Sequence, residues 1–196
     1  MTGRLTRRPG GAGRLRALLE SGQTIVAPGA FDPLAARLVE EAGFPAVYMT
    51  GFGTSAALLG RPDVGLLTMT EMVDNAARIA ACVDIPVIAD ADTGYGNPLN
   101  VIRTVGAYES AGVAGIHIED QVAPKKCGHM EGKLVIPADE MAAKIRAATE
   151  ARASVRAMIT KSELARASVA ARILAAISSA GTTSLPSMCP HFLGAT

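Results

Sequence analysis

The chain has 196 residues, of which 49% are hydrophobic and 19% charged, and this composition excludes intrinsic disorder, collagen and disulfide-stabilised mini-proteins. The length fits one domain, and a formal net charge of +1 gives no overall field that would attract nucleic acid or an anionic membrane. Three widely spaced cysteines without a C-x-x-C motif favour a reducing compartment, so we expect a cytoplasmic protein.

The two ends of the chain differ in composition from the rest. Residues 1–20 are rich in arginine and contain no acidic residue before Glu20. No apolar signal segment follows these arginines, so we interpret residues 1–20 as a basic arm, with an organellar transit peptide as the alternative. The residues after Arg172 lack charge, but serine, glycine and proline interrupt them, which excludes a membrane span.

From residue 24 onward, short apolar runs alternate with longer segments of helical pattern. Strands are expected at residues 24–27, 46–49, 86–89 and 115–118. Helices are expected from Pro33, after Asp32 as N-cap, to Glu41, from about Thr70 as N-cap to Cys82, from about Pro98 to Ser110, and from Ala138 to about Ala151. A glycine-rich loop follows the second strand, and a polar loop, residues 119–136, follows the fourth.

Strands that are apolar throughout and are each followed by a helix indicate parallel strands buried on both faces. The pattern therefore predicts an α/β fold, either a (β/α) barrel or an open doubly wound sheet. Both architectures place active sites just after the strands, where the polar residues of this chain cluster. No G-x-G-x-x-G motif or P-loop is present, so nucleotide binding has little support.

Acidic residues follow the third and fourth expected strands. Asp90 and Asp92 are two residues apart at the end of one strand, so both side chains can project from the same rim. Glu119 ends the next strand, and neighbouring parallel strands lie about 4.8 Å apart. An all-oxygen ligand set suits Mg²⁺ or Mn²⁺, whereas the alternative is ordinary helix capping by solvated acids.

A cysteine with basic neighbours lies in the loop after the fourth strand. Cys127 lies within Lys125-Lys126-Cys127-Gly128-His129, and this electropositive setting lowers the pKa of a thiol and makes it reactive. A free cysteine is more often a small core residue, which is our interpretation of Cys82 inside its helix.

Three segments together resemble the isocitrate lyase/phosphoenolpyruvate mutase superfamily: residues 90–97, residues 115–121 and the run K-K-C-G-H at residues 125–129. The K-K-C-G-H run followed by Met-Glu-Gly-Lys is similar to the short carbon–carbon lyases that act on 2-methylisocitrate, 2,3-dimethylmalate or oxaloacetate. The resemblance covers roughly residues 21–150. It implies an incomplete (β/α)8 TIM-type barrel of about four βα units, followed by an atypical helical or irregular tail at residues 151–196.

The resemblance also implies roles for individual residues. Mg²⁺ (or Mn²⁺) would be held by Asp90, Asp92 and Glu119, with Asp63 as a further acidic residue near the metal. The substrate carboxylate would be bound by Tyr48, Thr50, Gly51, Phe52 and Gly128. The catalytic residue would be Cys127, on a mobile gating loop, with Lys125 and His129 completing its electropositive setting. Relatives often have S-G-G after the second strand, so Thr50 and Phe52 depart from the pattern and leave the substrate preference open.

Beyond about residue 151 the family pattern is absent. Family members have an A-R-T-D-A segment whose arginine holds substrate, whereas this chain continues with Ala/Arg/Ser-rich sequence, of which residues 161–177 could form a helix. We interpret this change as a frameshift or truncation, with a genuine divergent tail as the alternative.

The family pattern leaves three functional hypotheses. The first is a Mg²⁺-dependent lyase that cleaves a small 2-hydroxy di- or tricarboxylate or decarboxylates oxaloacetate. The second is a phosphonate-type mutase similar to carboxyvinyl-carboxyphosphonate phosphorylmutase, although such mutases usually lack the Cys-Gly-His run. The third is an inactive remnant. The expected partner is a small carboxylate, with neither nucleic acid nor membrane, and full-length relatives are expected to be homo-oligomers.

Overall fold

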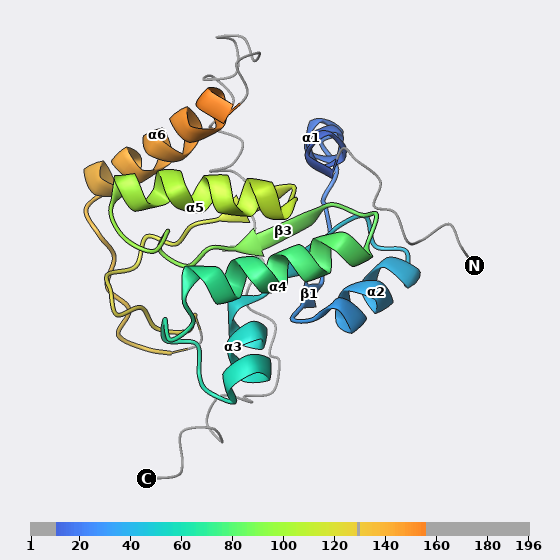
Figure 1. The fold of residues 1–196 in the computed structure, drawn as a ribbon, viewed down its shortest axis with the longest axis horizontal. Helices are drawn as coiled ribbons and strands as arrows, with labels where there is room; N and C mark the ends of the chain where they lie inside the picture. The colour runs from blue at the N-terminus through green and yellow to red at the C-terminus, as the bar shows by residue number, and fades with distance from the viewer. Residues whose placement is uncertain (1–10, 129, 156–196) are drawn as a thin grey trace. The chain divides into compact units, whose positions relative to one another are not determined.

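The computed structural model describes residues 11–128 and 130–155. Four parallel strands form one sheet in the order β1-β2-β3-β4 (Figure 1). The strands are β1 (Gly29–Ala30), β2 (Val47–Met49), β3 (Val87–Asp90) and β4 (Gly115–His117). The parallel order and the helix after each strand confirm the expected α/β fold with about four βα units of a barrel. Of the expected tail at residues 151–196, the part from residue 156 onward lies outside the described residues.

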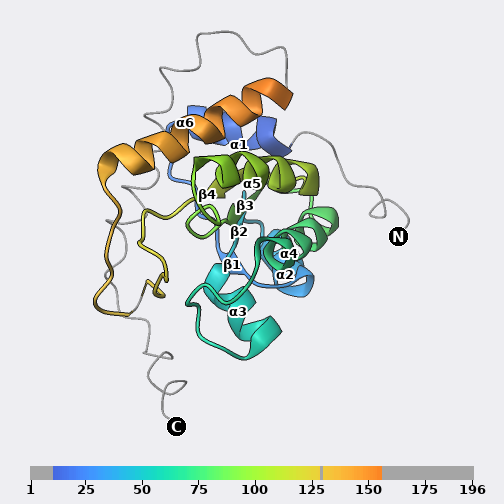
Figure 2. The ribbon, with the colours of Figure 1, turned by 60° about the vertical axis from the view of Figure 1, so that its left-hand side comes forward.

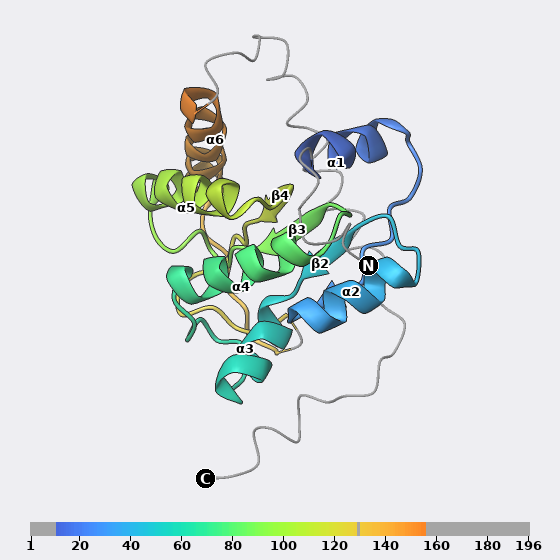
Figure 3. The ribbon, with the colours of Figure 1, turned by 45° about the vertical axis from the view of Figure 1, so that its right-hand side comes forward.

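Within the described residues, six helices accompany the sheet: α1 (Gly11–Glu20), α2 (Pro33–Glu41), α3 (Gly51–Leu59), α4 (Met69–Cys82), α5 (Pro98–Ala111) and α6 (Ala138–Val155). Helices α2, α4 and α5 pack next to one another along one side of the strands (Figure 2). Helix α3 directly follows β2, beyond the carboxyl end of that strand (Figure 3). Within the described ranges, no helix has both the length and the apolar character needed to cross a membrane.

The helix starts follow from capping side chains. The Asp32 carboxylate accepts a hydrogen bond from the Ala35 N–H at 2.7 Å before Pro33, and Asn97 caps α5 before Pro98. Helix α4 begins earlier than expected, because Thr68 rather than Thr70 is its N-cap and forms a capping box with Glu71.

Other elements differ from the sequence-based expectation. The first strand is Gly29–Ala30 rather than residues 24–27, because β2 pairs only with this later segment and Val26 is 53% exposed. The glycine-rich segment after β2 is helix α3, since Thr50 caps it and its later residues are helix-forming alanines and leucines. Residues 11–20 of the expected basic arm form α1, whose Leu15 is buried against Gly115 at the start of β4.

The hydrophobic core lies between the sheet and its helices. Its largest fully buried side chains include Met49 of β2, Met72 and Ile79 of α4, and Tyr108 of α5. A second cluster joins α5 to α6 through Val101, Val105 and Ala151. The side chains of α4 and α5 thereby hold these helices against the sheet.

Replacing Ile79 by alanine should destabilise the chain by about 2–5 kcal/mol, because Ile79 is fully buried in this core and the truncation leaves a cavity. Urea unfolding followed by circular dichroism measures the change. The matched control is Leu34→Ala at a position that is 69% exposed, which should shift the free energy of unfolding by about 0.5 kcal/mol or less. Equal losses in the two variants would contradict this core assignment.

Candidate active site

Three carboxylates converge at the carboxyl ends of the strands. Asp90 is the last residue of β3, Asp92 follows it in the next turn, and Asp63 comes from the connection between α3 and α4. One carboxylate oxygen from each lies within 4.8 Å of the others, and all three residues are buried. Of the four residues expected at the metal, these three meet directly.

The backbone of Gly51, at the start of α3, touches this cluster. Its N–H donates to Asp90 Oδ2 at 3.2 Å, while the other oxygen, Asp90 Oδ1, accepts from the Asp92 N–H at 2.9 Å. A Cβ at position 51 would lie only 2.5 Å from Asp90 Oδ2, so this position requires glycine. Gly51 therefore fixes the orientation of a carboxylate, in addition to its expected role in substrate binding.

Lys125 forms ion pairs with two members of the acidic cluster, Asp63 and Asp92. Its ammonium nitrogen lies 2.9 Å from Asp63 Oδ1 and also pairs with Asp92, and its side chain is only 3% exposed. Burial alone would lower the pKa of Lys125, but the Asp92 and Asp63 carboxylates raise it above its ordinary value, so the group stays charged. The sequence predicts Lys125 as part of the cysteine's setting, whereas the structure shows it paired with the expected metal carboxylates.

Glu119 lies after β4, beside the cluster. Burial and the neighbouring aspartates raise its pKa to about 7, although Lys125 opposes the shift. Its Oε2 accepts a hydrogen bond from the Gln121 amide at 2.8 Å. The charges of the aspartates therefore act on Glu119. Among the described residues, only the three aspartates form a group of three whose carboxylate oxygens lie within 4.8 Å of one another.

A tyrosine–histidine pair lies on the neighbouring strands. The Tyr48 hydroxyl is 3.1 Å from His117 Nδ1, and burial together with Asp90 and Glu119 raises the pKa of Tyr48. Tyr48 was expected as a substrate contact, whereas His117 was not expected at the site. His117 lies directly opposite Asp90 in the sheet, and its only mark in the sequence is a polar side chain within an apolar strand.

The loop that carries Cys127 is folded over these residues. The Gln121 side chain both donates to the Lys126 carbonyl and accepts from the Lys126 N–H, each at 3.0 Å, and Gln121 also forms a bridge with Val135. Cys127 is 3% exposed, although its loop is polar in sequence. The hydrogen bonds of Gln121 thus hold the backbone of Lys126, the residue before Cys127, in place.

The remaining predicted site residues are less closely tied to the cluster. Thr50 Oγ1 accepts from the Gly53 N–H at 3.3 Å, which assigns this hydroxyl to the capping of α3. Phe52 lies in the first turn of α3, and Gly128 is exposed, with its carbonyl accepting from Lys133 Nζ at 2.6 Å. His129 lies outside the described residues.

The donor set fits a hard divalent cation. Three buried carboxylates face a single ammonium group, so the cluster keeps an excess of negative charge. Oxygen-only ligands with few protein groups are the pattern by which proteins hold Mg²⁺. Asp63, Asp90 and Asp92 would hold the ion, with Glu119 beside it.

Replacing Lys125 by methionine should cost about 3–5 kcal/mol of folding free energy in metal-free buffer, because two buried carboxylates lose their counter-ion. Urea unfolding of the variant and the parent measures the loss. Lys133→Met is the control on the same loop, since Lys133 is exposed and donates only to carbonyls. If both variants lost the same stability, the ion-pair assignment would be wrong.

The raised pKa of Glu119 predicts a pH dependence of stability. The folded state binds this proton more tightly than the unfolded state, so its contribution to stability should fall as pH rises from about 4.5 through about 7. We expect the urea concentration at the unfolding midpoint of the metal-free chain to decrease as the pH is raised from about 5 to about 8. The decrease should be smaller in Glu119→Gln. Parallel pH profiles for the two proteins would refute this assignment.

Comparison with known proteins places the chain in a family. A model of the family described as phosphoenolpyruvate phosphomutase matches residues 15–179. The 2,3-dimethylmalate lyase of Eubacterium barkeri is 55% identical over 148 residues, which make up 76% of this chain and 51% of that enzyme. The chloroplastic carboxyvinyl-carboxyphosphonate phosphorylmutase of Arabidopsis thaliana is 48% identical over 162 residues, covering 77% of this chain and 48% of that protein.

Solved structures agree. Oxaloacetate acetylhydrolase in complex with 3,3-difluorooxalacetate matches with a TM-score of 0.72 and 48% identity, over 75% of this chain and 50% of that one. A crystal structure of 2,3-dimethylmalate lyase also gives 0.72, at 47% identity. The chain spans about half the length of the curated relatives it matches. The matched residues include the aspartate cluster and the Cys127 loop, and the chain belongs to the isocitrate lyase/phosphoenolpyruvate mutase superfamily.

Proposed function

We propose that the chain acts as a carbon–carbon lyase that depends on Mg²⁺ (or Mn²⁺). Its substrate is a small 2-hydroxy di- or tricarboxylate of the 2-methylisocitrate or 2,3-dimethylmalate type, which it cleaves, or oxaloacetate, which it decarboxylates. The convergence of Asp63, Asp90 and Asp92 beneath the Cys127 loop carries this proposal. Its 55% identity to a 2,3-dimethylmalate lyase supports it. Residues 21–150 are proposed as the part that supplies the metal carboxylates and the cysteine.

The proposed roles follow from the position of each group. The aspartates hold the cation, which when bound supplies positive charge that stabilises negative charge on the substrate oxygens. Tyr48 lies in β2, and residues 50–52 follow that strand as the N-cap and first turn of α3; they are proposed to hold a substrate carboxylate. The buried hydroxyl of Tyr48 stays protonated because its pKa is raised, so it can donate a hydrogen bond.

Cys127 is proposed to handle the proton at the leaving carbon. In a retro-Claisen cleavage of a 2-hydroxy acid, a general base takes the proton of the 2-hydroxyl, the alkoxide collapses to a carbonyl, and the electron pair of the broken carbon–carbon bond passes to the leaving fragment. The Cys127 thiol then protonates that carbon. Its burial within the folded loop keeps water away from the carbanion, since the thiol is only 3% exposed.

A phosphonate mutase is the second candidate. The 48% identity to a carboxyvinyl-carboxyphosphonate phosphorylmutase supports it, because the same aspartate scaffold suits a reaction at phosphorus. We favour the lyase because the chain has the Cys-Gly-His run at residues 127–129, which mutases of the family usually lack.

Pyruvate release from 2-methylisocitrate, 2,3-dimethylmalate and oxaloacetate tests the proposal, since each would yield pyruvate on cleavage. We expect Mg²⁺-dependent turnover that falls by about 10³-fold or more in Cys127→Ser, because a hydroxyl is a far weaker acid than a thiol. Cys82→Ser is the matched control, since Cys82 lies in α4 and bonds only to backbone carbonyls.

Equal rates in the two cysteine variants would exclude the role of Cys127. A folded chain that turns over none of the three acids, with or without Mg²⁺, would overturn lyase activity for this chain and leave a non-catalytic remnant. Turnover of a phosphonate substrate alone would favour the mutase.

A further inference from the structure

The turn that carries the metal carboxylates has an unusual backbone. Asp92 and Tyr95 are the two non-glycine residues with positive φ among the described residues, at 48° and 58°. Left-handed conformations are costly for residues with a Cβ and persist only where the surroundings impose them. Asp92 is itself one of the three clustered carboxylates, so its direction depends on this conformation.

The surroundings hold the turn by its carbonyl groups. All five successive carbonyls of residues 90–94 accept a hydrogen bond, and the donors come from the turn itself, α5, α6 and the end of β4. The acceptor and donor pairs are Asp90 with Tyr108 Oη at 2.9 Å, Ala91 with Gly94 N at 2.9 Å, Asp92 with Glu119 N at 2.7 Å, Thr93 with Lys144 Nζ at 3.1 Å and Gly94 with Thr104 Oγ1 at 3.0 Å.

The Tyr108 hydroxyl is the donor nearest to the carboxylates. Tyr108 is fully buried, and its single hydroxyl proton goes to the Asp90 carbonyl. The Tyr95 hydroxyl lies 3.3 Å from that of Tyr108 and must therefore donate to it. Burial raises the pKa of both tyrosines, so both hydroxyls stay protonated and the chain of donors runs from Tyr95 through Tyr108 to Asp90.

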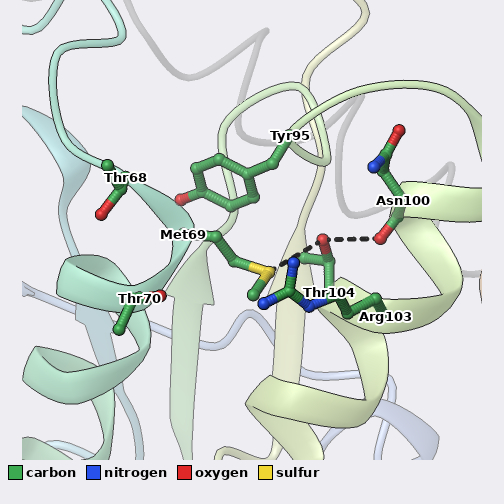
Figure 4. Close-up of a pocket in the computed structure, with 7 residues that line it drawn as sticks. All are labelled: Thr68, Met69, Thr70, Tyr95, Asn100, Arg103 and Thr104. Atoms are coloured by element: carbon green, nitrogen blue, oxygen red, sulfur yellow. Dashed lines mark hydrogen bonds between the residues drawn. The ribbon is translucent and has the colours of Figure 1, made fainter.

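Tyr95 also borders a cavity of about 230 Å³ between the turn and the first residues of α4 and α5. Figure 4 shows the Tyr95 ring beside Met69, with Thr104 next to the Met69 sulfur. The Thr104 hydroxyl shares its single proton between the Gly94 and Asn100 carbonyls, each at 3.0 Å, and its oxygen lies 3.4 Å from the Met69 sulfur. The phenol ring thus lies between the turn and α4, while its hydroxyl reaches Tyr108.

We propose that Tyr108 and Tyr95 are positioning residues that fix the left-handed turn at residues 90–96 and thereby aim the Asp90 and Asp92 carboxylates at a common cation. The part that concerns the cation rests on the proposed function, whereas the part that concerns the turn does not. Tyr108 acts directly on the Asp90 carbonyl, and Tyr95 acts through Tyr108.

Two measurements on the 196-residue chain test the proposal: Mn²⁺ titration by calorimetry, and hydrogen–deuterium exchange of the peptide that spans residues 90–96 in metal-free buffer. Tyr108→Phe removes one hydroxyl and keeps the ring. We expect its Mn²⁺ Kd to rise about tenfold, since partners of metal ligands typically contribute this much, and amide exchange in the turn to accelerate by a similar factor. Tyr95→Phe should have a smaller effect alone and almost none in the Tyr108→Phe background.

Two controls separate positioning from a general loss of stability. Ser110→Ala removes a hydroxyl from the same helix that donates only to Gly106, so it should leave both readouts unchanged. Ile79→Val lowers stability in the core of α4 without touching the turn, so it should lower the thermal midpoint but preserve the Kd.

If Tyr108→Phe matched Ser110→Ala in both readouts, the proposal would be overturned. If the parent chain bound no Mn²⁺ but Tyr108→Phe still accelerated amide exchange in the turn, the positioning of the turn would be supported. The metal dependence of the proposed function would then be overturned. If the Mn²⁺ Kd of Ile79→Val rose as much as that of Tyr108→Phe, overall stability, and not positioning, would control the site.

Discussion

The whole site depends on one buried ammonium group among carboxylates. Three aspartates within 4.8 Å repel one another strongly where water is largely excluded, and Lys125 opposes that repulsion by pairing with Asp63 and Asp92. Because Lys125 belongs to the loop after β4, the same interaction ties that loop to the sheet. Cys127, two residues further along the chain, is buried in the same loop.

The sequence was sufficient to predict the elements that local chemistry determines. Asp32-Pro33 and Asn97-Pro98 mark helix starts because each pair combines a capping side chain with a proline suited to the first turn. The gathering of Asp90 and Glu119 was also predictable, since apolar parallel strands bring their carboxyl ends to one edge of a sheet. The family resemblance added Asp63, which no strand pattern would have indicated.

Interactions between distant residues could not be predicted in this way. Lys125 meets Asp63 across 62 positions, so its sequence neighbours suggested only an electropositive setting for Cys127. His117 was marked only by its polar side chain inside an apolar run, although its register opposite Asp90 places it at the site. Thr24–Ala27 was apolar enough for a strand, but strand formation needs a partner, and β2 pairs with Gly29 and Ala30 instead.

Under the proposed function, the charges at the site limit how much negative charge of a substrate the cluster itself can neutralise. One ammonium group and one bound divalent cation would together balance the three aspartates. A dicarboxylate then adds negative charge that this balance does not cover. Lys126 and Lys133 are on the loop that carries Cys127, and their ammonium groups bond to loop carbonyls. Because Lys125 is already committed to the aspartates, further positive charge for a dicarboxylate has to come from groups outside the cluster.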